Sequence, residues 1–247
     1  MKTILITGAT AGFGEAAARK FVAGGWRVIG TGRRDERLRA LQQELGDTFL
    51  PLAIDMRDIE GLDSIARLAP PWNEIDLLLN NAGLAPPTDP LPETDWDRIQ
   101  TVIDTNVTGL VALTRALLPK LIERKGQIIN LSSVAATYPY KGGAVYAGTK
   151  AFVRQFSLDL RADLHGTGVR VTSVEPGMAE TEFTIVRTGG DKHASDTLYA
   201  GMDPMTAEDL ADLFWWLANL PPHLNINTVE LMPVSQSFAG FTVAREG

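Results

Sequence analysis

Three residues whose side chains suit proton transfer at a carbonyl or alcohol oxygen lie within one short stretch of the chain. Tyr146 and Lys150 are four positions apart and would share one face of a helix, and Ser133 precedes the tyrosine by thirteen positions. A lysine ammonium near a phenol stabilises the phenolate and lowers its pKa from about 10 toward neutral pH. Such a phenol can give or take the proton on a substrate oxygen, and the Ser133 hydroxyl can hold that oxygen while charge develops on it.

A glycine-rich loop lies near the start of the chain, between an apolar run and a helical pattern. Its sequence is Thr7-Gly8-Ala9-Thr10-Ala11-Gly12-Phe13-Gly14. Glycines there let the backbone turn tightly and approach a pyrophosphate, and the helix N-terminus offers free N–H groups and a partial positive charge. The spacing differs from the more familiar Gly-x-Gly-x-x-Gly, and glycines near a turn can be purely structural. The position between a strand and a helix favours a dinucleotide site.

The residues after the second apolar run favour NADP over NAD. A carboxylate usually occupies that position in NAD-specific folds, because it binds the ribose 2′-hydroxyl. This chain has Arg33 and Arg34 there, and a guanidinium binds a 2′-phosphate through charge-assisted hydrogen bonds. Asp35 and Glu36 keep NAD possible, although they also suit the first turn of the next helix. Asp55, after the third run, could bind the adenine amino group or cap the helix that follows.

An alternation of strands and helices would have to position these residues. The apolar runs are nearly continuous in Val, Ile and Leu, as in parallel strands covered by helices on both faces. They occupy residues 3–7, 27–31, 49–54, 75–79, 127–131, 169–174 and 228–232. Helical patterns occupy residues 13–23, 34–45, 59–68, 94–124 (two merging segments), 144–164 and 206–220.

This order predicts a single α/β domain over residues 1–247, with a Rossmann-like, doubly wound parallel sheet of about seven strands. The ligand crevice should lie at the carboxyl ends of the strands. Residues 176–203 interrupt the alternation and are predicted to be irregular. A long loop in a compact domain is usually functional or mobile, so we expect residues 177–203 to cover the substrate.

Composition excludes several classes of function. The chain is 45% hydrophobic, which is enough for a full core, and its net charge of −7 argues against binding nucleic acid or an anionic membrane. It has no cysteine, which excludes disulfides and thiol nucleophiles and fits a reducing cytoplasm. No run is long enough to span a membrane. The three histidines are far apart in sequence, so we expect no metal site.

The sequence resembles the short-chain dehydrogenase/reductase superfamily over essentially its whole length. The matching motifs are the glycine loop, Asn80-Asn81-Ala82-Gly83, Asp104-Thr105-Asn106-Val107, Ser133, Tyr146-x-x-x-Lys150 and Pro176-Gly177-Met178-Ala179-Glu180-Thr181. The resemblance implies that Tyr146 is the acid/base and that Ser133 positions the substrate oxygen. Lys150 would bind the nicotinamide ribose, and Asn106 would support a water that links Lys150 to solvent. Thr181 would bind the nicotinamide carboxamide.

The cofactor site implied by the resemblance is extensive. The residues expected to line it are Gly8, Thr10, Gly12, Phe13, Gly14, Arg33, Arg34, Asp55, Met56, Asn81, Gly83, Tyr146, Lys150, Pro176, Gly177, Met178 and Thr181. Two features depart from the commonest pattern. Gly148-Thr149 replaces Ala-Ser before the lysine, and the glycine loop has no basic residue, so selectivity for the 2′-phosphate would rest on Arg33 and Arg34.

A narrower resemblance concerns the NADP-dependent 3-hydroxy acid dehydrogenases. It rests on Gly8-Ala-Thr-Ala-Gly-Phe-Gly14, Thr31-Gly-Arg-Arg34, Lys150-Ala-Phe-Val-Arg-Gln-Phe-Ser157, Asp163-Leu-His-Gly166 and Asn225-Ile-Asn-Thr228. That group oxidises serine and allo-threonine or reduces small semialdehydes, and similar proteins reduce sulfoacetaldehyde to isethionate. It is typically tetrameric, which implies a homotetramer. The alternatives are a broad carbonyl or 3-oxoacyl reductase, and a cofactor-binding regulator without turnover.

Arg187 is the candidate for binding the acid group of such a substrate, beside Ser133 and Tyr146. It lies just beyond the segment expected to cover the nicotinamide. A guanidinium fork matches carboxylate or sulfonate oxygens and would fix which carbon faces the hydride. Lys192 is a rival in the same stretch, and a solvated arginine is the alternative without function.

Overall fold

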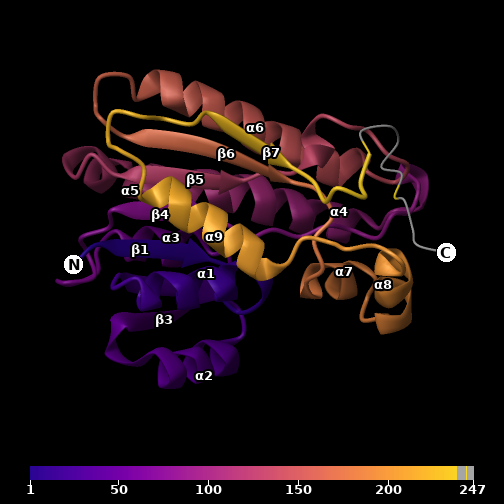
Figure 1. Ribbon diagram of the computed structural model, residues 1–247, viewed down its shortest axis with the longest axis horizontal. Coiled ribbons are helices and arrows are strands. Elements are labelled where there is room, and N and C mark those ends of the chain that lie inside the picture. The colour runs from indigo at the N-terminus through magenta and orange to yellow at the C-terminus, as the bar shows by residue number, and fades with distance from the viewer. Residues whose placement is uncertain (238–242, 244–247) are drawn as a thin grey trace.

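All seven apolar runs form strands of one parallel sheet in the computed structural model, which describes residues 1–237 and residue 243 (Figure 1). The strand order is β3-β2-β1-β4-β5-β6-β7. The strands are β1 (Thr3–Thr7), β2 (Arg27–Gly32), β3 (Phe49–Ala53), β4 (Leu77–Asn80), β5 (Gln127–Leu131), β6 (Arg170–Pro176) and β7 (Thr228–Leu231). The predicted fold class is confirmed, while the predicted end of the domain at residue 247 lies outside the described residues.

Successive strand residues face opposite layers of the core. Ile4 and Ile6 of β1 belong to one apolar cluster, whereas Leu5 between them belongs to the other. Residues on β4 alternate in the same way, with Leu78 in the cluster of Leu5. All of these side chains are buried. Both faces of the sheet are therefore covered, which explains the continuous apolar runs.

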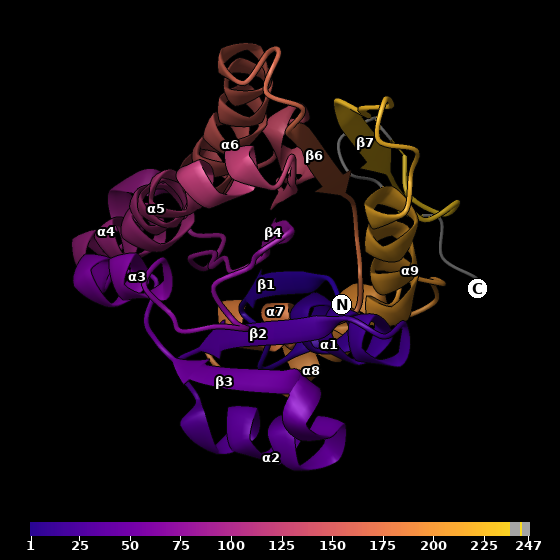
Figure 2. The same ribbon diagram turned by 90° about the vertical axis from the view of Figure 1, so that its left-hand side faces the viewer.

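Helices form the two covering layers. The α-helices within the described residues are α1 (Gly12–Ala23), α2 (Asp35–Leu45), α3 (Ile59–Ile65), α4 (Trp96–Ile103), α5 (Leu110–Glu123), α6 (Ala144–Asp163), α7 (Glu182–Arg187), α8 (Lys192–Tyr199) and α9 (Ala207–Ala218), of which α7 and α8 lie outside these layers. Figure 2 shows α3, α4, α5 and α6 on one side of the sheet and α1 and α9 on the other. No helix within the described residues is long and apolar enough to cross a membrane.

The long helical pattern at residues 94–124 is a composite, as expected. A π-helical turn, Asp104–Gly109, joins α4 to α5. It packs closely on a neighbouring loop, because a Cβ at Gly109 would lie 2.1 Å from the backbone oxygen of Met56. This turn places Asn106 in the interior, where it is 1% exposed.

The expectation of an irregular stretch at residues 176–203 is wrong, since two short helices form there. The Thr181 side chain caps α7 by accepting from Phe183 N, and the Asp191 side chain caps α8 by accepting from Ala194 N. Gly189 and Gly190, both with positive φ, separate the two helices. Figure 1 shows α7 and α8 projecting together beyond the sheet. We call residues 177–203 the covering segment.

Candidate active site

Ser133, Tyr146 and Lys150 lie together at the carboxyl end of β5. Ser133 follows the strand, and its hydroxyl accepts from Ala135 N at 3.1 Å and donates to the Pro176 carbonyl at 3.3 Å. It also forms a hydrogen bond with the Tyr146 hydroxyl. The fold therefore places a strand-end hydroxyl beside a phenol from the first turns of α6, as the spacing predicted.

The pKa of Tyr146 moves in the direction opposite to the one expected. Burial raises it to about 12, while the hydrogen bond with Ser133 and the positive charge of Arg187 work in the lowering direction. Lys150 Nζ lies 5.7 Å from the centre of the Tyr146 ring. In the cofactor-free chain the phenol is therefore protonated at neutral pH.

Lys150 is buried, with 4% exposure. Its ammonium donates to the Leu131 carbonyl at 2.7 Å. Burial lowers its pKa from 10.5 to about 8, because the apolar surroundings disfavour the charge. With a pKa this close to neutral, the protonation of Lys150 can change when a neighbouring side chain gains or loses a proton.

Asn106 connects three parts of the site. Its Nδ2 donates to the Leu84 carbonyl at 2.8 Å and to Thr149 Oγ1 at 3.0 Å, and its Oδ1 accepts from Leu84 N at 2.8 Å. Thr149 is one of the two residues that depart from the family pattern. A Cβ at Gly83 would lie 3.3 Å from Lys150 Nζ and 3.6 Å from Asn106 Oδ1. Glycine at this position leaves room beside both polar atoms.

The glycine loop has the geometry of a phosphate-binding turn. Gly8 and Gly12 have φ of +73° and +52°, and no side chain caps the N-terminus of α1. The first N–H groups of α1 thus remain available to an anion. A Cβ at Gly14 would lie 2.3 Å from the Gly8 oxygen. Asn81 fixes the loop, because its Nδ2 donates to the Thr7 carbonyl at 2.8 Å.

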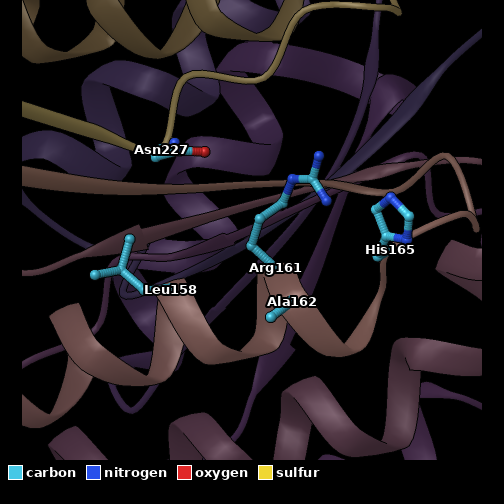
Figure 3. Close-up of a pocket in the computed structure, with 5 residues that line it drawn as sticks. All are labelled: Leu158, Arg161, Ala162, His165 and Asn227. Atoms are coloured by element: carbon cyan, nitrogen blue, oxygen red, sulfur yellow. The ribbon is translucent and has the colours of Figure 1, made fainter.

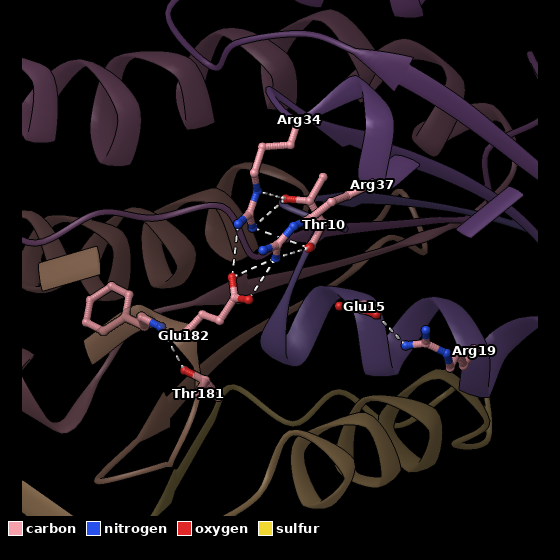
Figure 4. A network of polar contacts seen from close by, with 8 residues as sticks. Thr10, Glu15, Arg19, Arg34, Arg37, Thr181 and Glu182 are labelled. Atoms are coloured by element: carbon pink, nitrogen blue, oxygen red, sulfur yellow. Dashed lines mark hydrogen bonds and ion pairs between the residues drawn. The ribbon is translucent and has the colours of Figure 1, made fainter. Parts of the chain in front are cut away.

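A pair of arginines converges on one carboxylate beside the glycine loop (Figure 4). Arg34 Nη2 donates to Thr10 Oγ1 at 3.0 Å, and Arg34 Nη1 donates to Glu182 Oε2 at 2.9 Å. Arg37 Nη1 donates to both Glu182 oxygens at 2.8 Å. Burial works to raise the pKa of Glu182, but these two guanidiniums outweigh it and hold that pKa below its usual value. The sequence analysis missed Arg37, although its spacing of three from Arg34 places both on one helix face.

Asp55 is held by Arg57, which donates to it from the backbone N–H at 2.9 Å and from Nη2 at 2.9 Å. The Arg57 side chain is the main cause that lowers the pKa of Asp55, and Arg33 adds a smaller effect. The alternative of Asp55 as a helix cap is wrong, because Asp58 caps α3 by accepting from Gly61 N. Within the described residues, Arg33 does not share the Glu182 carboxylate with Arg34 and Arg37.

The side chains of Met56 and Phe13 face the interior. Met56 belongs to one apolar cluster and Phe13 packs against the other. Met56 is buried, so its backbone is the part that can line a cofactor site, whereas the Phe13 ring is half-buried and keeps some exposed surface.

The covering segment begins over the glycine loop. A Cβ at Gly12 would lie 3.3 Å from the Cβ of Thr181. Gln236, which the sequence analysis missed, fixes the segment's start, because its Oε1 accepts from Met178 N at 2.7 Å. Gly177 N donates to the Leu231 carbonyl at 2.8 Å.

Arg187 reaches from the end of α7 to Tyr146. Its Cζ lies 5.7 Å from the centre of the Tyr146 ring, and its Nη2 donates to the Tyr140 hydroxyl at 2.9 Å. Phe183, one turn earlier, has its ring 5.7 Å from that of Tyr146. The rival Lys192 is 76% exposed and pairs with Asp196 at 2.9 Å. The structure thus brings Arg187, and not Lys192, to the site.

A surface hollow lies at the opposite end of α6 (Figure 3). It is lined by Leu158, Arg161, Ala162, His165 and Asn227. Fifteen residues of helix separate Arg161 from Tyr146, which is about 22 Å along the axis, so the hollow is not part of this site. Within residues 1–237 and 243, no group of three or more His, Cys, Asp or Glu side chains could hold a metal ion.

Comparison with known proteins agrees with the site. Residues 2–190 match the family model described as short chain dehydrogenase. The chain is 61% identical to the serine 3-dehydrogenase of Agrobacterium fabrum, over 99% of this chain and 98% of that protein. It is 50% identical to the NADP-dependent 3-hydroxy acid dehydrogenase YdfG of Escherichia coli K12, over 98% and 99% of the two chains. A solved structure of the closed form of a serine dehydrogenase complexed with NADP+ has 50% identity, covers 99% of this chain and 100% of that one, and superposes with a TM-score of 0.94. The chain therefore belongs to the short-chain dehydrogenase family.

Proposed function

We propose that the protein is an NADP-dependent dehydrogenase that interconverts a small 3-hydroxy acid, such as serine, and its semialdehyde or keto form. The names of its full-length relatives support the reaction and the cofactor. The observation that carries the substrate class is the Arg187 guanidinium, 5.7 Å from the ring of the proton-transfer residue Tyr146. A cation at that place suits a substrate whose acid group is separated by one carbon from its reacting carbon.

The residues present fit NADP. Positive φ in the glycine loop and the uncapped N-terminus of α1 suit the pyrophosphate. Arg34 and Arg37 already share one anionic group, the Glu182 carboxylate, and suit a 2′-phosphate in the same way. Lys150 and Thr181 would hold the nicotinamide end. When bound, the nicotinamide ring supplies or accepts the hydride.

The chain's own residues handle the proton. In the reducing direction the protonated Tyr146 donates its proton to the carbonyl oxygen, which suits a phenol whose pKa is about 12. The Ser133 hydroxyl holds the same oxygen as it gains charge. Lys150 lies close enough to stabilise the phenolate that results. Asn106 keeps Thr149, next to Lys150, in place.

A substrate panel tests the proposal. Serine, allo-threonine, 3-hydroxypropionate and 3-hydroxyisobutyrate are assayed with NADP and with NAD, and malonic semialdehyde and sulfoacetaldehyde with NADPH. We expect the highest kcat/KM for a small 3-hydroxy acid with NADP. A preference for sulfoacetaldehyde would assign a sulfonate substrate instead, and a preference for uncharged 3-oxoacyl thioesters would refute the acid class. No turnover with any compound would indicate a regulator.

We further propose a cytoplasmic homotetramer. The absence of cysteine fits a reducing compartment. Apolar surface available for subunit contacts includes Trp216, 52% exposed, and Phe152, 40% exposed and stacked on Phe156 with 5.8 Å between ring centres. Strand β7 ends the sheet and could pair with a second copy. Light scattering during size-exclusion chromatography should give four times 26.8 kDa, and a monomeric mass would refute this part.

A further inference from the structure

Arg187 is held at the site by a contact that does not involve its own helix. Its Nη2 donates to the hydroxyl of Tyr140 at 2.9 Å, and its Cζ lies 5.4 Å from the centre of that ring. Its Nε is buried and has no hydrogen-bond partner within the described part of the chain. A buried guanidinium N–H is costly to leave unpaired, so this donor suits an oxygen brought by a ligand.

Tyr140 is itself fixed by the backbone. It stands in the loop before α6, where Gly143 N donates to the Tyr140 carbonyl at 3.1 Å. A Cβ at Gly143 would lie 2.7 Å from Cε1 of the Tyr140 ring, so the ring packs directly on the glycine. On the other side of the loop, a Cβ at Gly142 would lie 2.1 Å from the Thr88 oxygen. The hydroxyl that accepts from Arg187 is thus attached to a half-buried ring that packs on the backbone of Gly143.

The covering segment reaches Tyr146 through the side chains of Phe183 and Arg187. Phe183 and Arg187 are four residues apart and share the face of α7 that meets the tyrosine. An arginine side chain has many rotamers, and fixing it costs conformational entropy on binding. A partner that holds the guanidinium beforehand removes that cost.

We propose that Tyr140 is the positioning residue for acid recognition: its hydroxyl orients the Arg187 guanidinium so that Nε faces the carboxylate of the substrate beside Tyr146. This rests on the proposed function and adds a specificity-determining residue to it. The alternative is that the pair merely fastens α7, in which case it would affect charged and uncharged substrates alike.

Tyr140→Phe keeps the ring and removes only the hydroxyl. With the best 3-hydroxy acid of the panel, we expect KM to rise about tenfold, as for loss of a hydrogen bond to a charged group, with kcat nearly retained. KM for an uncharged aldehyde of similar size and the Kd of NADP should not change. Tyr138→Phe is the matched control. Tyr138 is two positions before Tyr140, and its hydroxyl donates to Glu230 at 3.0 Å and not to Arg187. We expect wild-type values for that control.

A double-mutant cycle with Arg187→Met separates the outcomes. If Tyr140 acts through Arg187, adding Tyr140→Phe to Arg187→Met should raise KM no further. Additive effects, equal losses on charged and uncharged substrates, or a Tyr140→Phe variant that behaves like Tyr138→Phe would each overturn the inference. If Arg187→Met raises KM selectively for acid substrates but Tyr140→Phe does not, the proposed function stands and the inference fails. An Arg187→Met variant without selectivity would refute both.

A binding measurement avoids dependence on turnover. In the Tyr146→Phe background with NADP bound, calorimetry gives the Kd of 3-hydroxypropionate directly. We expect Tyr140→Phe to weaken this binding about tenfold, and Tyr138→Phe to leave it unchanged. Equal affinity with and without the Tyr140 hydroxyl would overturn the inference.

Discussion

Replacing Lys150 by methionine should make the stability of the cofactor-free protein less dependent on pH. Lys150 is 4% exposed, and burial lowers its pKa from 10.5 to about 8. In the unfolded chain the pKa returns to its ordinary value, so between about pH 8 and 10.5 the unfolded state binds more protons than the folded state. The free energy of unfolding therefore rises with pH through that window, and the penalty is complete below it.

The expected size follows from the two pKa values. The shift from 10.5 to about 8 corresponds to a penalty of about 3 kcal/mol at pH 7. About 1 kcal/mol of this disappears between pH 7 and pH 9. Methionine is similar in length and does not titrate, and the lost bond to the Leu131 carbonyl weakens the variant equally at every pH. Relative to Lys150→Met, the free energy of unfolding of the wild type should thus rise by about 1 kcal/mol from pH 7 to pH 9.

Urea unfolding followed by the fluorescence of the five tryptophans gives the required free energies. Both proteins are measured at pH 7, 8 and 9, without cofactor and at one protein concentration. Lys192→Met is the control. Asp196 raises the pKa of this exposed lysine, so Lys192 stays protonated in the folded protein from pH 7 to pH 9. The difference in unfolding free energy between the wild type and this variant should therefore not change over that interval. Parallel pH profiles for the wild type and Lys150→Met would refute the reasoning.

Three further predictions concern catalysis, cofactor choice and packing. Tyr146→Phe should lower kcat by about 10²–10⁴-fold and leave NADP binding intact; a kcat above about a tenth of wild type would contradict the acid/base role. Arg34→Ala and Arg37→Ala should each weaken NADP binding about tenfold or more and spare NAD; equal losses in calorimetric titrations would show that neither binds the 2′-phosphate. Gly14→Ala places a Cβ 2.3 Å from a backbone oxygen of the loop, so Tm and cofactor affinity should both fall. Gly148→Ala is the control and should be tolerated, because the added Cβ would have no atom within 4 Å.

The sheet and the grouping of Ser133, Tyr146 and Lys150 could be predicted because their signals are local. A strand buried on both faces requires a continuous apolar run, and all seven runs became strands. Tyr146 and Lys150 are on one helix, so their spacing fixes their relation. Ser133 follows a strand whose end is visible in the sequence. None of these inferences needs knowledge of which distant segments pack together.

The features that were missed or misjudged depend on such distant packing. Tyr140 and Arg187 are 47 residues apart, and only the fold of the covering segment brings them into contact. The direction of the Tyr146 pKa was misjudged because burial, which no spacing reveals, outweighs its charged neighbours. Helix α7 has six residues, too few to display a periodic pattern, and depends on the Thr181 cap.

This short helix also connects the two ends of the site. At its start, the Glu182 carboxylate uses donors of Arg34 and Arg37 that a 2′-phosphate would need. At its end, Arg187 reaches Tyr146. A phosphate bound by Arg34 and Arg37 would compete with Glu182 for their N–H groups and so change the contacts of α7. The position of Arg187 depends on α7, because it is the last residue of that helix. Any effect of the 2′-phosphate on acid binding must then be matched by an equal effect of the acid on NADP binding, since coupling between two sites is reciprocal. NAD lacks the phosphate and cannot produce this coupling.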